Sequence, residues 1–131
     1  MPTLASAVDF ETALLRTLRE DAGLSALVGN KVFPLAIPAG NYLPCVTFQR
    51  LGGPANTLAG PSGLEEIDLL IDAWARDYHE AKAVAKAVRA AMPANGPRFG
   101  AHLIEDQDLY EDGTNYFRVS MEFKVWFLET E

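Results

Sequence analysis

The feature that most constrains the fold is strict alternation near the end of the chain. Apolar side chains recur at every second position, namely Phe117, Val119, Met121, Phe123, Val125 and Phe127. Successive side chains of a strand point to opposite faces, so this pattern predicts a strand over 115–128 with one buried face. A slip of one residue would move the whole apolar set to the solvent side, and the register is therefore fixed.

A second extended pattern precedes this strand, over 102–110, and the two are separated by an Asp112-Gly113 step. Asp-Gly between two extended runs is a strong β-hairpin signal. The last strand is far longer than the usual five or six residues. We therefore expect it to bend, to bulge or to project past the body of the protein.

The rest of the chain mixes helical and extended patterns. Helical spacing of apolar residues predicts helices over about 8–20 and 77–92, with a short helical turn between Asp21 and Gly29. Extended patterns predict strands over 32–34, 45–51 and 65–74. This order predicts an α+β fold: a largely antiparallel sheet of four or five strands, two main helices packed on one face and a long C-terminal β-hairpin.

The length of 131 residues and the apolar content of 49% fit a single domain over 1–131. A long flexible loop is expected at about 52–63, where four glycines and two prolines occur. No apolar run approaches the roughly 20 residues that span a bilayer, and the first residues lack a targeting pattern. We expect no membrane association.

Charge is distributed unevenly along the chain. The net charge of −7 disfavours phosphate-driven binding of nucleic acid. Residues 22–64 contain no carboxylate and only two cations, Lys31 and Arg50. An uncharged surface with apolar side chains is typical of a protein–protein contact, and a loop packed on its own domain is the alternative. The sequence leaves both open.

Candidate chemical groups do not form a recognisable site. Cys45, His79 and His102 lack the close spacing of zinc ligands, and Cys45 lies in an apolar string that predicts a buried, reduced thiol. No motif supports pairing of Cys45 with a histidine for nucleophilic catalysis. We therefore predict no catalytic, metal or cofactor site and no enzyme activity.

Two charged patterns favour ordinary surfaces. The acidic string 105–112 fails as a calcium loop, because a loop starting at Asp106 would place Phe117 where the bidentate Glu is required. On a strand, Asp106, Asp108 and Asp112 would share one side, as on a solvated face. Another set lines one side of the 77–92 helix at helical spacing and is interpreted as solvation: Lys82, Lys86 and Arg89.

Several ordered motifs together resemble a known family. They are Leu24-Ser25-Ala26-Leu27-Val28-Gly29, Val32-Phe33-Pro34, Leu43 to Gln49, Ile71-Asp72-Ala73-Trp74-Ala75 with Tyr78 and Glu80-Ala81, Asp108 to Glu111, and Tyr116 to Trp126. In order, spacing and total length, over roughly 10–128, the chain resembles the tail completion or tail terminator proteins of long-tailed bacteriophages and prophages.

The resemblance implies a structural role in the virion. Such proteins form a ring, usually of six subunits, on the head-proximal end of the tail tube, where they stop tube growth and join the head. The implied partners are other copies of the chain, the tail tube protein and the head-completion or stopper protein, with DNA only passing through the lumen. Assembly would occur in the cytoplasm of the bacterial host.

The residues that contact another subunit or the tube are a hypothesis. We predict a subunit or tube interface that includes Arg50, Leu51, Asn56, Thr57 and Leu58. One alternative is a head-completion or stopper adaptor. Another is a small α+β ligand-binding module with a platform formed by Trp74, Tyr116 and Trp126 on the polar sheet face.

Overall fold

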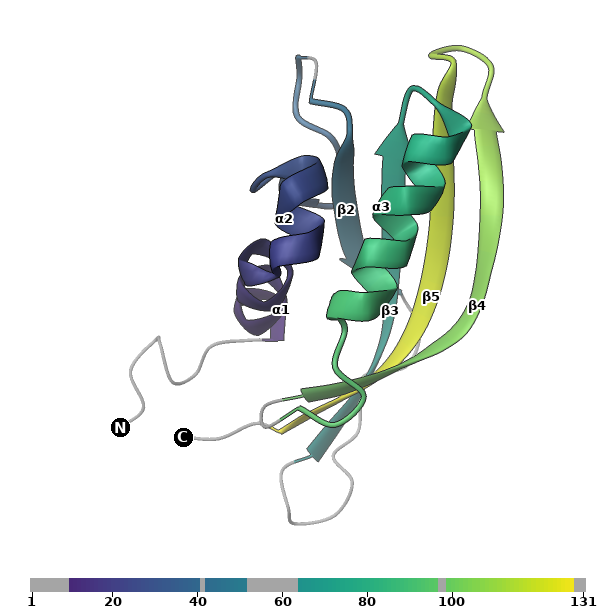
Figure 1. The fold of residues 1–131 in the computed structure, drawn as a ribbon. Helices are drawn as coiled ribbons and strands as arrows, with labels where there is room; N and C mark the ends of the chain where they lie inside the picture. Colours follow the sequence, from purple (N-terminus) through teal and green to yellow (C-terminus); the bar gives the residue numbers. More distant parts are fainter. Residues whose placement is uncertain (1–9, 41, 52–63, 97–98, 129–131) are drawn as a thin grey trace.

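The computed structural model describes residues 10–40, 42–51, 64–96 and 99–128, and in it helices cover one face of a sheet (Figure 1). The elements are α1 (Phe10–Glu20), α2 (Ala22–Val28), β1 (Val32–Pro34), β2 (Cys45–Arg50), β3 (Leu64–Ala75), α3 (Tyr78–Ala91), β4 (Phe99–Glu111) and β5 (Tyr116–Leu128). The strand order is β1-β2-β3-β5-β4. Only the β1–β2 pair is parallel, so the predicted α+β fold is confirmed.

Local capping explains where two helices begin. The side chain of Asp77 accepts a hydrogen bond from the Glu80 N–H at 3.1 Å, which satisfies one of the free donors in the first turn of α3. Asp21 does the same for α2 by accepting from the Leu24 N–H at 2.9 Å. The α2 helix ends at Gly29, whose φ of 65° is readily adopted by glycine.

The C-terminal hairpin forms as predicted, with a different turn chemistry. Glu111 pairs with Tyr116, and four turn residues lie between them. The left-handed residue is Asn115, with a φ of 63°, and the Asn115 N–H donates to the Glu111 carbonyl. Because Ala75 pairs with Phe117, the turn begins only one residue beyond the end of β3. The hairpin therefore does not project at this end.

The length of β5 is accommodated by bending. Figure 1 shows β3, β5 and β4 curving together along the sheet. The pairing of β4 with β5 shifts by one residue between Leu103 and Glu105, which makes Ile104 the extra residue of a β-bulge. A bulge bends its strand and increases the local twist. The bulge thus lies in the partner of β5, and β5 itself pairs continuously with β3.

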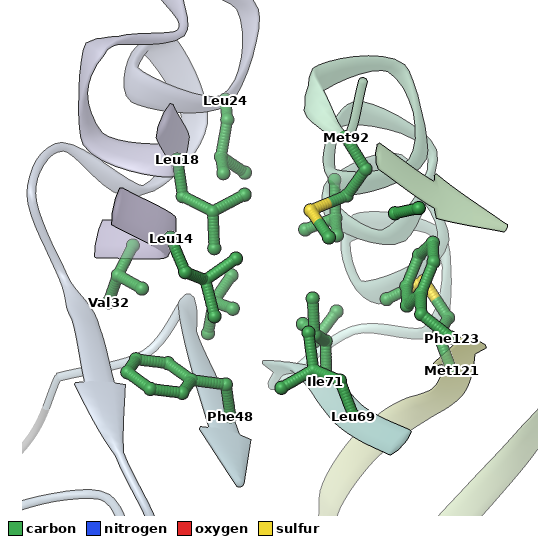
Figure 2. Close-up of a cluster of buried hydrophobic side chains, with 14 of the residues drawn as sticks. Leu14, Leu18, Leu24, Val32, Phe48, Leu69, Ile71, Met92, Met121 and Phe123 are labelled. Carbon is green, nitrogen blue, oxygen red and sulfur yellow. The ribbon is translucent and has the colours of Figure 1, made fainter. Parts of the chain in front are cut away.

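The hydrophobic core lies between the helices and the sheet (Figure 2). All six alternating apolar side chains of β5 face it, and five of them are buried; Phe117 is half-buried. Phe10 of α1 closes one end by contacting Phe99 and Phe127 edge to face, with ring centroids 5.2 and 5.7 Å apart. Leu14 and Leu18 continue this buried face of α1.

Different strand ends and connecting segments lie at the two ends of the sheet. Figure 1 shows the end of β2, the start of β3, the start of β4 and the end of β5 at one end. The β1–β2 connection, the β3–α3 turn and the hairpin turn lie at the other. The loop predicted at about 52–63 lies outside the described residues. None of the helices in the described part of the chain is long and apolar enough to cross a membrane.

Candidate functional site

The predicted interface residues lie where β2 ends. Arg50 is the last residue of β2 and is exposed, and Leu51 is half-buried. The Leu51 N–H donates to the Asp68 carbonyl at 2.9 Å, which holds the chain against β3. Asn56, Thr57 and Leu58 lie outside the described residues. The structure therefore brings Arg50 and Leu51 to one end of the sheet, and their contact with another subunit stays a prediction.

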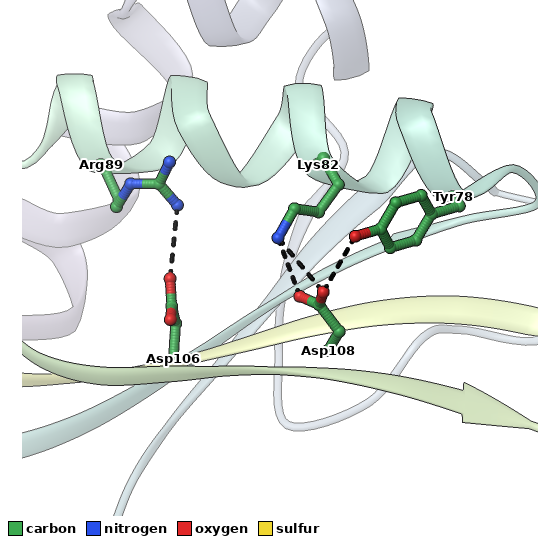
Figure 3. Close-up of polar contacts among 5 residues, drawn as sticks. All are labelled: Tyr78, Lys82, Arg89, Asp106 and Asp108. Carbon is green, nitrogen blue, oxygen red and sulfur yellow. Dashed lines mark hydrogen bonds and ion pairs between the residues drawn. The ribbon is translucent and has the colours of Figure 1, made fainter.

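Two ion pairs connect the acidic strand to the basic face of α3 (Figure 3). Lys82 Nζ of α3 lies 3.0 Å from Asp108 Oδ1 of β4, and the Tyr78 hydroxyl donates to Asp108 Oδ2 at 3.1 Å. Arg89 pairs with Asp106 at 3.7 Å. Lys82 and Arg89 remain partly exposed, as the interpretation as a solvated face expects, and each also pairs with a carboxylate of the same chain. Lys86 is exposed on the same helix.

The bulge decides which acidic side chains meet α3. Past Ile104, Asp106 and Asp108 pair with Met121 and Val119, whose side chains face the helices. Asp106 and Asp108 share this side, as predicted, whereas Asp112 lies in the hairpin turn. The side they share is the helix side and not an open face, because the extra residue reverses the alternation.

Hydrogen bonding shifts the pKa values of the central pair. The hydrogen bond from Lys82 holds the pKa of Asp108 below its ordinary value of 3.8. The same hydrogen bond raises the pKa of Lys82 above 10.5. Both side chains are well exposed, so solvent and salt screen the pair. The pair orients β4 against α3 and leaves neither group activated for acid–base chemistry near neutral pH.

The opposite sheet face carries a second polar cluster. Trp74 Nε1 donates to Thr47 Oγ1 at 2.9 Å, and the Arg118 guanidinium lies over the Trp74 ring, 5.0 Å from its centroid. Arg118 Nη1 also donates to Asp72 Oδ2 at 3.3 Å. Among the described residues, Asp72 Oδ1 and Arg118 Nε have no partner. Trp74 is thus engaged by its own chain, which removes much of the platform that a ligand-binding module would use.

Of the remaining large side chains of this face, Tyr116 adjoins that cluster and Trp126 lies apart from it. Tyr116 contacts Trp74 edge to face, with centroids 6.4 Å apart. Trp126 is exposed near the other end of β5, beside His102 at 6.1 Å. Lys124 bridges Glu66 and Asp68 at 3.0 and 3.2 Å. Trp74 and Trp126 therefore do not form one continuous aromatic platform.

The single cysteine is buried, as the sequence predicted. Cys45 begins β2 on the side of the sheet away from the helices, opposite Trp74 in the pairing with β3. Burial raises the pKa of the Cys45 thiol to about 11, which keeps it protonated and poorly nucleophilic. The described residues contain no group of three or more His, Cys, Asp or Glu side chains placed to hold a metal ion.

Sequence reasoning missed two features at the edges of the sheet. Leu35, just after β1, has a φ of 68° and an exposed side chain. Ile104, in the bulge of β4, is exposed as well. No local pattern signals either one, because leucine rarely adopts positive φ and the bulge depends on how β4 pairs with β5.

Comparisons with known proteins give one family and one fold. The profile of the family described as tail completion protein gp17 matches residues 12–128. A comparison with the curated proteins gives no match. Among solved structures, a chain of the virion of a native gene transfer agent particle is similar at a TM-score of 0.71 and 23% identity, covering 95% of this chain and 98% of that chain. That likeness shows a shared fold.

Proposed function

Because this chain belongs to the tail completion protein gp17 family, we propose that it forms a ring on the head-proximal end of a phage tail tube. Membership of the family makes it a structural protein of a phage tail. In the proposed role, a ring of six subunits stops growth of the tube and presents the surface to which the DNA-filled head is joined. The observation that carries the proposal is the match over residues 12–128.

The chemistry of the described residues supports a structural role. The charged clusters on both sides of the sheet are paired within the chain, as in Lys82 with Asp108 and Arg118 with Asp72. The Cys45 thiol is buried and its pKa is raised to about 11. These charged groups bind each other and connect elements of the same chain, which is typical of a structural role. We therefore assign no catalytic residue and no cofactor.

The proposed partners follow from the position at the tail end. They are other copies of the chain, the tail tube protein below the ring and the head-completion or stopper protein above it. The net charge of −7 suits a lumen through which DNA passes without binding, because like charges repel. The protein would be assembled in the cytoplasm of the bacterial host and would remain at the head–tail junction of the virion.

The proposed function is tested by tube growth. Preformed tail tubes of the same phage are incubated with this protein and then supplied with more tube protein. The proposal predicts that elongation stops at one end and that added chain remains bound to the tubes. Continued growth at both ends would contradict it. Binding to isolated heads and not to tubes would instead favour a head-completion or stopper role.

The predicted interface is tested in the same assay. Leu58→Asp should leave the chain folded, with an unchanged circular dichroism spectrum, but should allow tubes to keep growing, because a charge would enter the proposed contact. Lys86→Ala, on the exposed side of α3, is the matched control and should stop growth like the natural chain. Normal arrest by Leu58→Asp would remove this residue from the interface.

A further inference from the structure

The exposed large apolar side chains of the described residues gather at the two opposite edges of the sheet. On the β1 side they are Leu27, Leu35 and Tyr42, and on the β4 side they are Leu103, Ile104, Tyr110 and, at the start of α3, Tyr78. Trp126, on the open sheet face, is the exception. Because β1 and β4 are the first and last strands in the sheet order, these two groups lie on opposite flanks of the molecule (Figure 1). We call them the β1 flank and the β4 flank.

Leu35 on the β1 flank is unfavourable for an isolated chain in two ways. Its side chain is 72% exposed, so it gains little from burial. Its φ is 68°, and the Ala36 N–H donates to the Pro34 carbonyl at 2.7 Å, which closes a three-residue γ-turn of the rare, strained form. Glycine or asparagine would fit this turn with less strain. A strained and exposed leucine points to a role outside the monomer.

The β4 flank offers a matching apolar surface. Ile104 is the extra residue of the β-bulge and is 51% exposed, with Leu103 exposed beside it. Tyr110, also exposed, lies further along the same strand. Isolated exposed apolar residues are common on protein surfaces, but the adjacent exposed pair Leu103 and Ile104 on an edge strand suits a contact.

Charge favours contact between unlike flanks. Lys31 directly precedes β1 and residues 22–51 contain no carboxylate, whereas residues 99–112 carry five carboxylates and no lysine or arginine. Two of the five, Asp106 and Asp108, are paired with α3. A symmetric contact between two β4 flanks would bring the unpaired carboxylates together, whereas a β1 flank would bring Lys31 to them.

We propose that the β1 flank of one subunit docks on the β4 flank of the next copy of the same chain, with Leu35 inserted beside Ile104 and Leu103. Repeated head-to-tail contact between opposite flanks generates a ring when the rotation closes. This inference rests on the proposed ring and names the surfaces that build it. It differs from the interface predicted at Arg50 to Leu58, which would contact the tube or another part of the neighbour.

Cross-linking on tail tubes tests the docking directly. A chain carrying both Ala36→Cys and Glu105→Cys, at exposed neighbours of Leu35 and Ile104, keeps the apolar contact residues in place. It is added to tubes and treated with a short bismaleimide reagent, and chains with only one of the two substitutions are the controls. The proposal predicts a ladder of covalent oligomers that ends at the ring number for the double variant and no ladder for either control. Cys45 should not interfere, because it is buried in the natural chain.

A second variant separates assembly from folding. Leu35→Asn relieves the backbone strain and removes the apolar side chain, so its thermal midpoint should equal or exceed that of the natural chain while its rings on tubes are lost. Suppose that the natural chain and the double cysteine variant both cap tubes but the variant forms no ladder. This result would overturn the inference about the flanks and would leave the proposed function intact. Natural chain that leaves tube ends bare would contradict both.

Discussion

At the scale of single residues, close backbone approach decides which substitutions the chain tolerates. Gly100 begins the part of β4 that lies against residues 93–96, where the Ala101 N–H donates to the Pro93 carbonyl at 2.8 Å. A Cβ at Gly100 would lie 2.7 Å from the Ala94 carbonyl oxygen. Nothing lies within 4 Å of the corresponding position at Gly113 in the hairpin turn. A side chain at position 100 would therefore clash with the backbone, whereas position 113 has room for one.

Gly100→Ala should destabilise the protein, because the backbone around Ala94 must move to admit the methyl group. Overpacking of this kind costs about 1 to 3 kcal/mol. Gly113→Ala, the matched control, should change the free energy of unfolding by less than about 1 kcal/mol. Urea unfolding followed by circular dichroism measures both. Equal midpoints for the two variants would refute the close approach at Gly100.

Cys45 should be unreactive in the folded chain. Its thiol is buried, and its pKa of about 11 leaves very little thiolate at neutral pH. Because the unfolded thiol has the lower pKa of 9.0, the unfolded state loses its proton first and stability should fall as pH rises from 9.0 to about 11. Labelling with a thiol reagent at about pH 8 should be far slower than in denaturant. Fast labelling of the native protein would show that Cys45 is accessible.

At the scale of elements, the bulge in β4 links the charge pattern to the fold. It turns Asp106 and Asp108 toward α3, where Arg89 and Lys82 bind them. The acidic string and the basic helix face, which look separate in the sequence, thus form one seam along the edge of the sheet. The seam connects α3 to the edge strand β4, while the helix itself packs on β3 and β5.

Lys82→Met should raise the pKa of Asp108 toward 3.8, because the hydrogen bond from Lys82 is the main cause of its lowered value. The contribution of this carboxylate to stability is present above its unfolded pKa and is lost as pH falls through its lower folded pKa. NMR titration of the side-chain carboxyl measures the shift. Lys86→Met on the same helix is the control and should leave Asp108 unchanged, and an unchanged pKa in Lys82→Met would contradict the pairing.

The predictable elements are those defined by local chemistry. The alternation from Phe117 to Phe127 was sufficient to predict β5 and its buried face, and Asp77 marked the start of α3. The sequence did not predict which face each β4 residue occupies after Ile104, because the acidic residues give no apolar alternation and the bulge depends on how β4 pairs with β5. The same holds for Leu35, whose strained turn is held by a hydrogen bond from its N–H to the Phe48 carbonyl in β2.

At the scale of the whole molecule, the fold is a single sheet with two different faces and two exposed edges. One face of the sheet is covered by helices, and the other carries polar clusters closed by Arg118 and Lys124. Among the described residues, large apolar side chains remain exposed mainly at the two edges. This distribution suits a subunit that contacts its neighbours edge to edge. Of the predicted interface, Arg50 and Leu51 lie at an end of the sheet, and the rest of that prediction remains to be tested.

The most direct test of the ring is electron microscopy of purified tail tubes mixed with the natural chain. We expect a cap at one end of each tube, the end that joins the head, with rotational symmetry and one 14.3 kDa subunit per repeat. Class averages of tube ends measure its presence and symmetry. Tube ends without a cap, or protein bound along the length of the tubes, would show that the chain does not cap tubes.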